Sequence, residues 1–244
     1  MTNPLVVVDA QAGLGPLATA PRNNPGAEQV IGWLLERWRK VGEPVLHVVH
    51  DSVEPDSLIK LSLPGGEFHP SCRPESDEPV IIKHVNSGFI GTDLEARLHQ
   101  LEADTVTFAG LTTNHCVSTT VRMAGNLGFT TWLAADGTAA FDHDSYDGTA
   151  WPAQTVHEVA LASLHREFTT VAPAHSIAEE LWGRELPVRP DGRLAAGPPA
   201  LGGPATGRPA TGRPTGCGTA GSGTAAPPGD PAPEHVRSPR RAES

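Results

Sequence analysis

Short apolar runs that alternate with helix-length segments are the feature that most limits how residues 1–185 can fold. The runs carry the Val, Ile and Leu residues typical of buried strands. They are Leu5–Asp9, Pro44–Val49, Pro79–Ile82, Thr105–Gly110, Phe129–Ala135 and Glu167–Val171. Apolar residues at helical spacing indicate helices between or after them: Gln29–Val41, a segment marked by Leu94, Leu98 and Leu101, then Cys116–Leu127, Ala153–His165 and His175–Trp182.

Strands separated by such helices are typical of βαβ units with a parallel sheet. Right-handed crossovers then place helices on both faces of that sheet. The sequence therefore predicts an α/β protein with a three-layer Rossmann-like fold and a six-stranded parallel sheet.

The composition of the chain changes near residue 190. Residues 191–244 are rich in Gly, Pro and Ala and contain the short repeat PATGRPATGRPTG. A segment of this composition contains too few large apolar side chains to offset the conformational entropy lost when the chain becomes ordered. We expect one domain at 1–190 and a disordered tail at 191–244.

Charge and cysteine content exclude several classes of protein. The formal net charge is −10, and no cluster of Lys and Arg precedes the tail, so we expect no nucleic-acid partner. No run approaches the roughly 20 apolar residues of a membrane span, and no basic segment followed by a long apolar stretch begins the chain. The three cysteines show neither paired nor metal-ligand spacing. These features favour a soluble, reduced, cytoplasmic protein without a membrane partner.

Reactive side chains follow three of the predicted strands. Asp9, Lys83 and the turn Leu111–Cys116 lie at strand carboxyl ends, where open parallel sheets bind ligands. Cys116 would begin a helix, where free N–H groups and the helix dipole favour a thiolate and can stabilise an oxyanion. A small buried cysteine with a structural role is the alternative.

A cysteine nucleophile needs an acid–base partner. His115 is adjacent to Cys116 but would project in a different direction. Asp9 is the better candidate, because burial at the sheet edge would raise its pKa and Lys83 could stabilise its charged form. Taken alone, Asp9 is better explained as a turn or capping residue, and Lys83 as an ordinary surface lysine.

Three blocks, LVVVDAQAGL, PVIIKHVNSGFIGTDLEARL and TFAGLTTNHCVSTTVRMAGNLGF, occur in this order between about residues 4 and 172. Together they resemble the isochorismatase-like cysteine hydrolase superfamily. The resemblance implies a catalytic triad of Asp9, Lys83 and Cys116. It also implies a cis peptide at Leu111–Thr112 and an oxyanion hole formed by the N–H groups of Thr112 and Cys116.

The same resemblance implies hydrolysis of a non-peptide C–N bond in a small amide through a thioester, with no cofactor and commonly as a homo-oligomer. Nicotinamidases of the superfamily carry a metal site after the second strand. The segment HDSVEPD keeps Asp51 but lacks the later histidines, so we expect no metal site. Isochorismatases proper cleave a vinyl ether without a cysteine nucleophile, so Cys116 favours C–N cleavage. His47 and His50 should face opposite sides of a strand and serve structural roles.

Expected substrate contacts follow from position alone. Gln11 and Leu14 come shortly after Asp9, while Asn86, Phe89 and His115 accompany the other two blocks. Phe89 could equally be a core residue. The polar loop 142–150, which contains His143, Asp144, Tyr146 and Asp147, could cover the site or reach a neighbouring subunit.

Several functions remain open at this level. A linear or cyclic amide could be the substrate, including the lactam of a streptothricin-type antibiotic, which one superfamily member opens. The Gly/Pro/Ala/Arg-rich tail resembles the product of a GC-rich actinobacterial gene, which would suit an antibiotic-modifying enzyme. A ureide or carbamoyl amide is the alternative. A thiol sensor, a ligand-binding module or a structural oligomer on the same fold would not be an enzyme, and a sensor would have no use for Asp9 and Lys83.

Overall fold

The computed structural model describes residues 2–15, 18 and 20–183. The expected tail at 191–244, Cys217 and the domain boundary at 190 lie outside the described residues. That boundary therefore stays a prediction.

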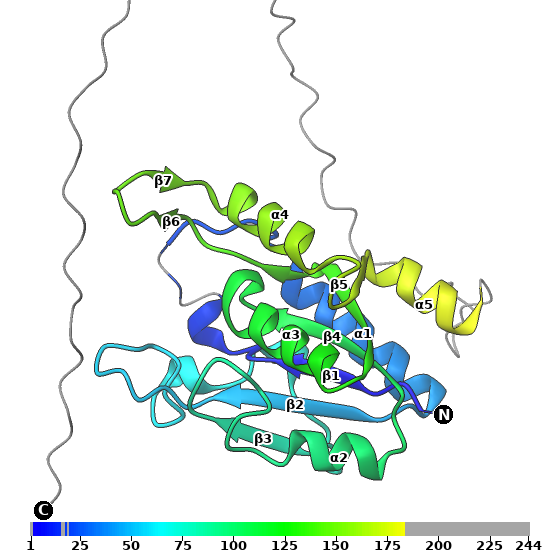
Figure 1. Cartoon of the computed structure of the whole chain (residues 1–244). Helices are drawn as coiled ribbons and strands as arrows, with labels where there is room; N and C mark the ends of the chain where they lie inside the picture. Colours follow the sequence, from blue (N-terminus) through cyan, green and yellow to red (C-terminus); the bar gives the residue numbers. More distant parts are fainter. Residues whose placement is uncertain (1, 16–17, 19, 184–244) are drawn as a thin grey trace, which may run out of the picture. The chain divides into compact units, whose positions relative to one another are not determined.

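Six strands form one parallel sheet in the order β3-β2-β1-β4-β5-β8 (Figure 1). Their bounds are β1 Leu5–Val8, β2 Val45–His50, β3 Val80–Lys83, β4 Thr105–Leu111, β5 Thr130–Ala139 and β8 Thr170–Ala172. The chain moves outward from β1 to β3, then returns to β4 on the other side of β1. This arrangement confirms the predicted sheet. The strand order reverses between β1 and β4, and open parallel sheets bind ligands at such a switch point.

Helices cover both faces of the sheet, because successive side chains of each strand point to opposite faces. Val6 and Val8 pack with α2 (Leu94–Gln100), α3 (Ser118–Asn126) and α4 (Ala153–Leu164). On the other face, Leu5 and Val7 pack with α1 (Ala27–Val41) and α5 (Ala174–Trp182). The three-layer α/β fold is therefore confirmed.

Short elements complete the described chain. An antiparallel ribbon joins β6 (His143–Asp144) to β7 (Ala150–Trp151) in the segment predicted to be a polar loop. Three 3₁₀ turns occur at Ala12–Leu14, Pro64–Gly66 and Pro70–Cys72. No helix within residues 2–183, as far as they are described, combines the length and apolar character needed to cross a bilayer.

The helix predicted at Cys116–Leu127 differs in its first turn. Residues Thr113–Val117 form a π-helical turn, and α3 begins only at Ser118. The wide turn arises because the N–H of Val117 donates to the carbonyl of Thr112, five residues earlier. Such turns are frequent at functional sites. Cys116 therefore belongs to a widened turn at the end of β4 and not to a regular helix.

Gly110 lets β4 pass close to β1 immediately before that turn. Its φ is +137°, and a Cβ at this position would collide with the backbone of Val8. The pairing of β4 with β5 also shifts register between Phe108 and Gly110. A side chain would therefore push apart the two strands that carry Asp9 and the cysteine turn.

Gly110→Ala should lower the free energy of unfolding by about 3 kcal/mol, because it adds both overpacking and an unfavourable φ. Gly128→Ala is the matched control. Gly128 also has a positive φ, of +95°, but open space lies where its Cβ would be. We expect it to cost only about 1 kcal/mol. Urea unfolding of both variants measures the difference; equal losses would contradict the close packing of β1 and β4.

Candidate active site

Asp9 and Lys83 form a buried ion pair at the carboxyl edge of the sheet. The ammonium Nζ of Lys83 donates to Asp9 Oδ2 at 2.7 Å, and both side chains are 0% exposed. Asp9 directly follows β1, and Lys83 is the last residue of β3. Along β3 the exposure alternates, with Ile81 and Lys83 on the buried face. The surface-lysine interpretation is therefore wrong.

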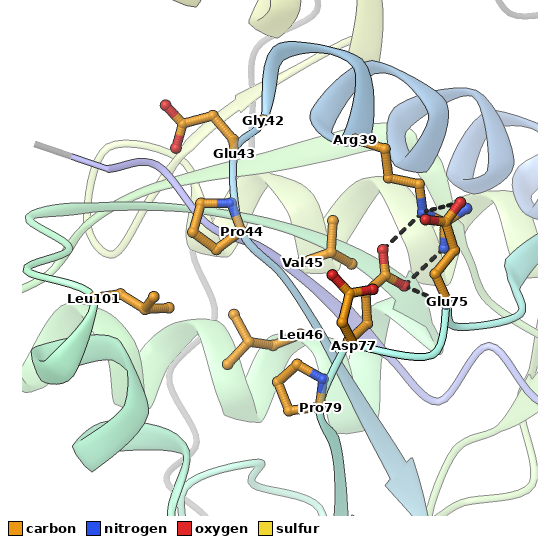
Figure 2. Close-up of a pocket in the computed structure, with 11 residues that line it drawn as sticks. Arg39, Gly42, Glu43, Pro44, Val45, Leu46, Glu75, Asp77, Pro79 and Leu101 are labelled. Atoms are coloured by element: carbon orange, nitrogen blue, oxygen red, sulfur yellow. Dashed lines mark hydrogen bonds and ion pairs between the residues drawn. The ribbon is translucent and has the colours of Figure 1, made fainter.

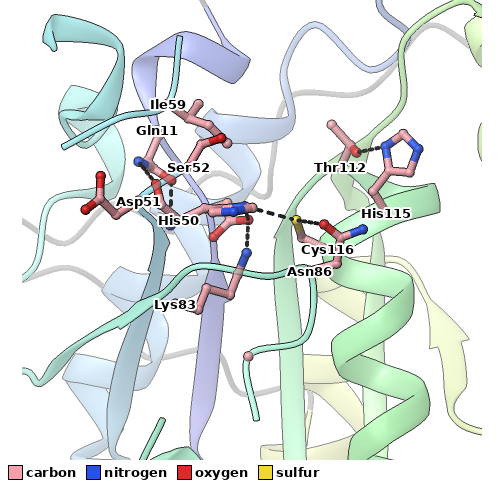
Figure 3. A network of polar contacts seen from close by, with 12 residues as sticks. Gln11, His50, Asp51, Ser52, Ile59, Lys83, Asn86, Thr112, His115 and Cys116 are labelled. Atoms are coloured by element: carbon pink, nitrogen blue, oxygen red, sulfur yellow. Dashed lines mark hydrogen bonds and ion pairs between the residues drawn. The ribbon is translucent and has the colours of Figure 1, made fainter. Parts of the chain in front are cut away.

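Cys116 lies beside this ion pair (Figure 3). Its Sγ, a carboxylate oxygen of Asp9 and a ring nitrogen of His50 all lie within 4.8 Å of one another. The peptide Leu111–Thr112 before the cysteine turn is cis, as the resemblance implied. Behind the turn, Thr113 Oγ1 lies 2.8 Å from Nδ1 of the buried His157, which holds the turn against α4.

Burial is the largest influence on the pKa of both the Asp9 carboxyl and the Cys116 thiol. It raises the pKa of Asp9, while the nearby Lys83 ammonium acts in the opposite direction. Oδ1 of Asp9 has no hydrogen-bond partner among the described residues, so one carboxylate oxygen is free to accept a proton.

The thiol of Cys116 departs from the expectation that a helix start favours thiolate. Burial and, after it, the negative charge of Asp9 raise its pKa to about 12, while Lys83 acts in the opposite direction. The expectation failed because desolvation of a buried sulfur outweighs the dipole of a short, widened turn. The surroundings of Cys116 therefore favour the protonated thiol.

His50 is a site residue that sequence reasoning missed. Its Nδ1 lies 3.8 Å from Cys116 Sγ and 3.9 Å from Asp9 Oδ2. Burial, followed by the charge of Lys83, lowers its pKa below the ordinary histidine value. The structural interpretation holds only for His47, which is fully buried beside Glu78 at 2.9 Å. The sequence feature that could have identified His50 is its position at the end of a predicted strand, which places it at the same sheet edge as Asp9 and Lys83.

A pocket of about 360 Å³ opens above the thiol. It is lined by Leu14, His50, Ile59, Asn86, Thr112, Asn114, His115, Cys116, Phe141 and His143. Three residues expected to contact substrate, Leu14, Asn86 and His115, line this pocket, and their contact with substrate stays a prediction. The thiol donates weakly to Asn86 Oδ1 at 3.9 Å. Ile59 and Phe141 were missed because their connecting segments show no motif of their own, whereas Asn114 was missed although it lies in the predicted turn Leu111–Cys116.

Gln11 and Phe89 do not lie where the sequence placed them. Gln11 is fully buried, and its amide bonds both the N–H and the carbonyl of His50 and the carbonyl of Gly66. It thereby fixes the end of β2 and does not line the pocket. Phe89 is 8% exposed and stacks against Phe129 in the core. Both residues were misplaced because their partners lie about 40 or more positions away in the sequence, where a local pattern cannot show them.

The loop 142–150 contributes to the pocket through one residue. His143 lines it, and its ring lies 5.7 Å from that of His115. Tyr146 at the tip of the ribbon is fully exposed, and the carboxylates of Asp144 and Asp147 lie on the same exposed ribbon. The loop thus borders the site, while a contact with a neighbouring subunit stays a prediction.

A second cavity, of about 380 Å³, lies at the opposite edge of the sheet (Figure 2). It is lined by the amino ends of β2 and β3 and by Arg39, Glu75 and Glu78. The guanidinium of Arg39 is paired with Glu78 at 2.7 Å. No cysteine of the described chain lines this cavity, whereas Cys116 lines the pocket of about 360 Å³.

Comparison with known proteins agrees with this geometry. The model of the isochorismatase domain matches residues 4–173. This chain belongs to the isochorismatase family. The family's protein YrdC of Bacillus subtilis is 44% identical over 167 residues, which is 68% of this chain and 89% of that protein.

Other members of the family show how far the likeness extends. An isochorismatase-family structure from Chromobacterium violaceum has 41% sequence identity and a TM-score of 0.70, covering 74% of this chain and 93% of that one. A streptothricin hydrolase of Streptomyces noursei is 32% identical over 141 residues, which is 57% of this chain but only half of that protein. The chain is therefore an isochorismatase-family hydrolase.

The charge of Asp9 can be tested through the reactivity of the thiol in this family member. Asp9→Asn removes a negative charge that raises the pKa of Cys116, so the thiolate fraction at mildly alkaline pH should increase. We expect about tenfold faster alkylation by iodoacetamide, since one pKa unit changes that fraction tenfold. In the wild type, the rate should keep rising with pH beyond the ordinary thiol value of 9.0.

Mass spectrometry of the digested protein measures the extent of alkylation of both cysteines of the described chain in one experiment. Cys72 is the internal control, because it is buried and distant and its sulfur donates to the carbonyl of Glu28. Its alkylation rate should not change. Slower alkylation of Cys116 in Asp9→Asn would show that the carboxylate does not control the thiol.

Proposed function

We propose that this protein is a cysteine-dependent amidohydrolase that cleaves a C–N bond in a small amide, lactam or ureide. The single observation that carries the proposal is the convergence of Cys116 with the buried Asp9–Lys83 pair at the floor of a pocket. A nucleophile, a proton acceptor and a fixed counter-charge are the groups that acyl transfer requires.

The proposed reaction begins with a substrate carbonyl above the thiol. Asp9 takes the thiol proton as the sulfur forms a bond with the carbonyl carbon, and the oxygen becomes negative. The N–H groups of Thr112 and Cys116 would stabilise that oxyanion. When the C–N bond breaks, Asp9 returns the proton to the leaving nitrogen. Water then attacks the thioester with Asp9 as base, which releases the carboxylic acid and restores the thiol.

Lys83 supports both proton transfers without touching the substrate. Its ammonium stabilises the charged carboxylate of Asp9, which burial would otherwise neutralise. It also partly offsets the effect of Asp9 on the thiol. The carboxylate therefore remains basic enough to accept a proton and acidic enough to return it, as general acid–base catalysis requires.

The lining of the pocket supports a small neutral substrate. No Asp, Glu, Lys or Arg is among the residues that line it. Leu14, Ile59 and Phe141 supply apolar surface, whereas Asn86 and His143 offer hydrogen bonds suited to amide or ureide groups. The likeness to a streptothricin hydrolase supports a lactam in particular. A ureide or carbamoyl amide is the second candidate, favoured by two amide side chains, Asn86 and Asn114, in the pocket lining.

A redox sensor fits the site less well. Sensor cysteines have accessible thiols with low pKa and a resolving partner. Cys116 is 6% exposed, and its pKa is raised. Cys72 is buried in the other core layer, so it is not placed to resolve an oxidised Cys116.

Substitution of the nucleophile tests the proposal directly. Across a panel of amides, lactams and ureides, Cys116→Ala should reduce amine or ammonia release by at least about a thousandfold, because the covalent route is lost. Cys72→Ser is the matched control and should retain the wild-type rate. Rapid acid quenching followed by mass spectrometry should find the acyl group on the peptide that contains Cys116. Full activity in Cys116→Ala would refute a thioester mechanism.

A further inference from the structure

Three different metal-ligating atoms meet at the floor of the pocket. They are the sulfur of Cys116, the Nδ1 of His50 and a carboxylate oxygen of Asp9, all within 4.8 Å of one another. Within the described ranges, this is the one group of three such side chains close enough to share an ion. From this convergence we propose that the site binds a thiophilic divalent cation, best matched by Zn²⁺, which reversibly blocks the nucleophile.

The donor set fits zinc better than the other common divalent ions. Zn²⁺ accepts thiolate, imidazole and carboxylate ligands, whereas Mg²⁺ and Ca²⁺ prefer oxygen alone. Around a tetrahedral zinc, neighbouring donors lie about 3.5 Å apart. The sulfur-to-nitrogen and nitrogen-to-oxygen distances are 3.8 and 3.9 Å, so small side-chain movements suffice. The fourth position would face the pocket, as in zinc sites with three protein ligands.

The surroundings of the ligands are organised for this role. The oxygen of Asp9 that lies 3.9 Å from His50 is Oδ2, which also accepts from Lys83, while Oδ1 is buried and has no hydrogen-bond partner among the described residues. The ring of His50 makes a hydrogen bond with the backbone of His84, and its Nδ1 is the nitrogen that lies towards the sulfur. A hydrogen bond from the ligating ring to a backbone group is a usual outer contact of a zinc-bound histidine.

Lys83 limits how tightly the cation can bind. Its ammonium lies 2.7 Å from the same carboxylate, and its charge repels the incoming ion. Binding also requires the thiol of Cys116 to release its proton to solvent, which makes binding pH-dependent. These two costs distinguish the site from a permanent structural zinc site. The ion should therefore exchange, and it should compete with any substrate for the sulfur.

This inference uses the residues of the proposed function but does not depend on turnover. Neighbouring polar groups do not offer an equivalent site. Oδ1 of Asp51 accepts a hydrogen bond from the N–H of Leu61 at 3.0 Å. His115 and His143 lie ring to ring at 5.7 Å, and no third donor joins them in a group of three.

Cobalt(II) is the probe for the test, because a thiolate ligand produces a charge-transfer band and tetrahedral geometry produces intense visible bands. The full-length Cys217→Ser protein is the background, since Cys217 lies outside the described residues. We expect one equivalent of Co²⁺ to produce both sets of bands and Zn²⁺ to abolish them. Cys116→Ser should lose the charge-transfer band, and His50→Gln should bind about tenfold more weakly or worse.

Two controls retain the proposed ligands and should keep the wild-type spectrum: Cys72→Ser, which removes a buried thiol elsewhere, and His115→Ala, which removes a pocket imidazole. Circular dichroism confirms that each variant is folded. Absence of the bands in the background protein, or their retention in Cys116→Ser, would overturn the inference. In an active protein, added Zn²⁺ should inhibit competitively with substrate, and EDTA should restore the rate. Cobalt bands in a protein that hydrolyses nothing would refute the proposed function and leave the metal site standing.

Discussion

The buried ion pair between Asp9 and Lys83 is the interaction on which the rest of the site depends. Two charges removed from water at 2.7 Å are tolerated only when each compensates the other, because an isolated buried charge costs several kcal/mol. The two residues end strands on either side of β2, so the sheet must form in its native order before they can meet. The pair in turn controls the charge beside Cys116, and with it the state of the thiol.

The surroundings of Cys116 favour its protonated form. Many cysteine enzymes lower the thiol pKa and store a reactive thiolate. Here burial and the carboxylate of Asp9 raise that pKa instead, and the base needed for attack lies within reach. A protonated thiol is a poor target for oxidants and alkylating agents. The proposed chemistry therefore begins only when a carbonyl is bound, at the cost of a proton transfer in the attacking step.

The groups proposed to react and the residues that form the pocket wall come from different parts of the fold. The reactive groups come from strand ends, which the sheet holds rigidly. Much of the pocket wall comes from connecting segments, such as Leu14, Ile59 and His143, which can vary without disturbing the sheet. This division explains how relatives with different substrates can share one fold. It also explains why family membership indicates a hydrolase but does not identify the substrate.

The sequence alone determined the parallel sheet, its two helical layers and the positions of Asp9, Lys83 and Cys116 at strand ends. Those features follow from local periodicity and from the rule that parallel strands present their carboxyl ends at one edge. Tertiary structure alone decided that His50 belongs to the site, that Gln11 and Phe89 do not line the pocket, and that the surroundings of Cys116 favour the protonated thiol. The reason is physical: burial, desolvation and side-chain partners depend on residues tens of positions away, and no local pattern contains them.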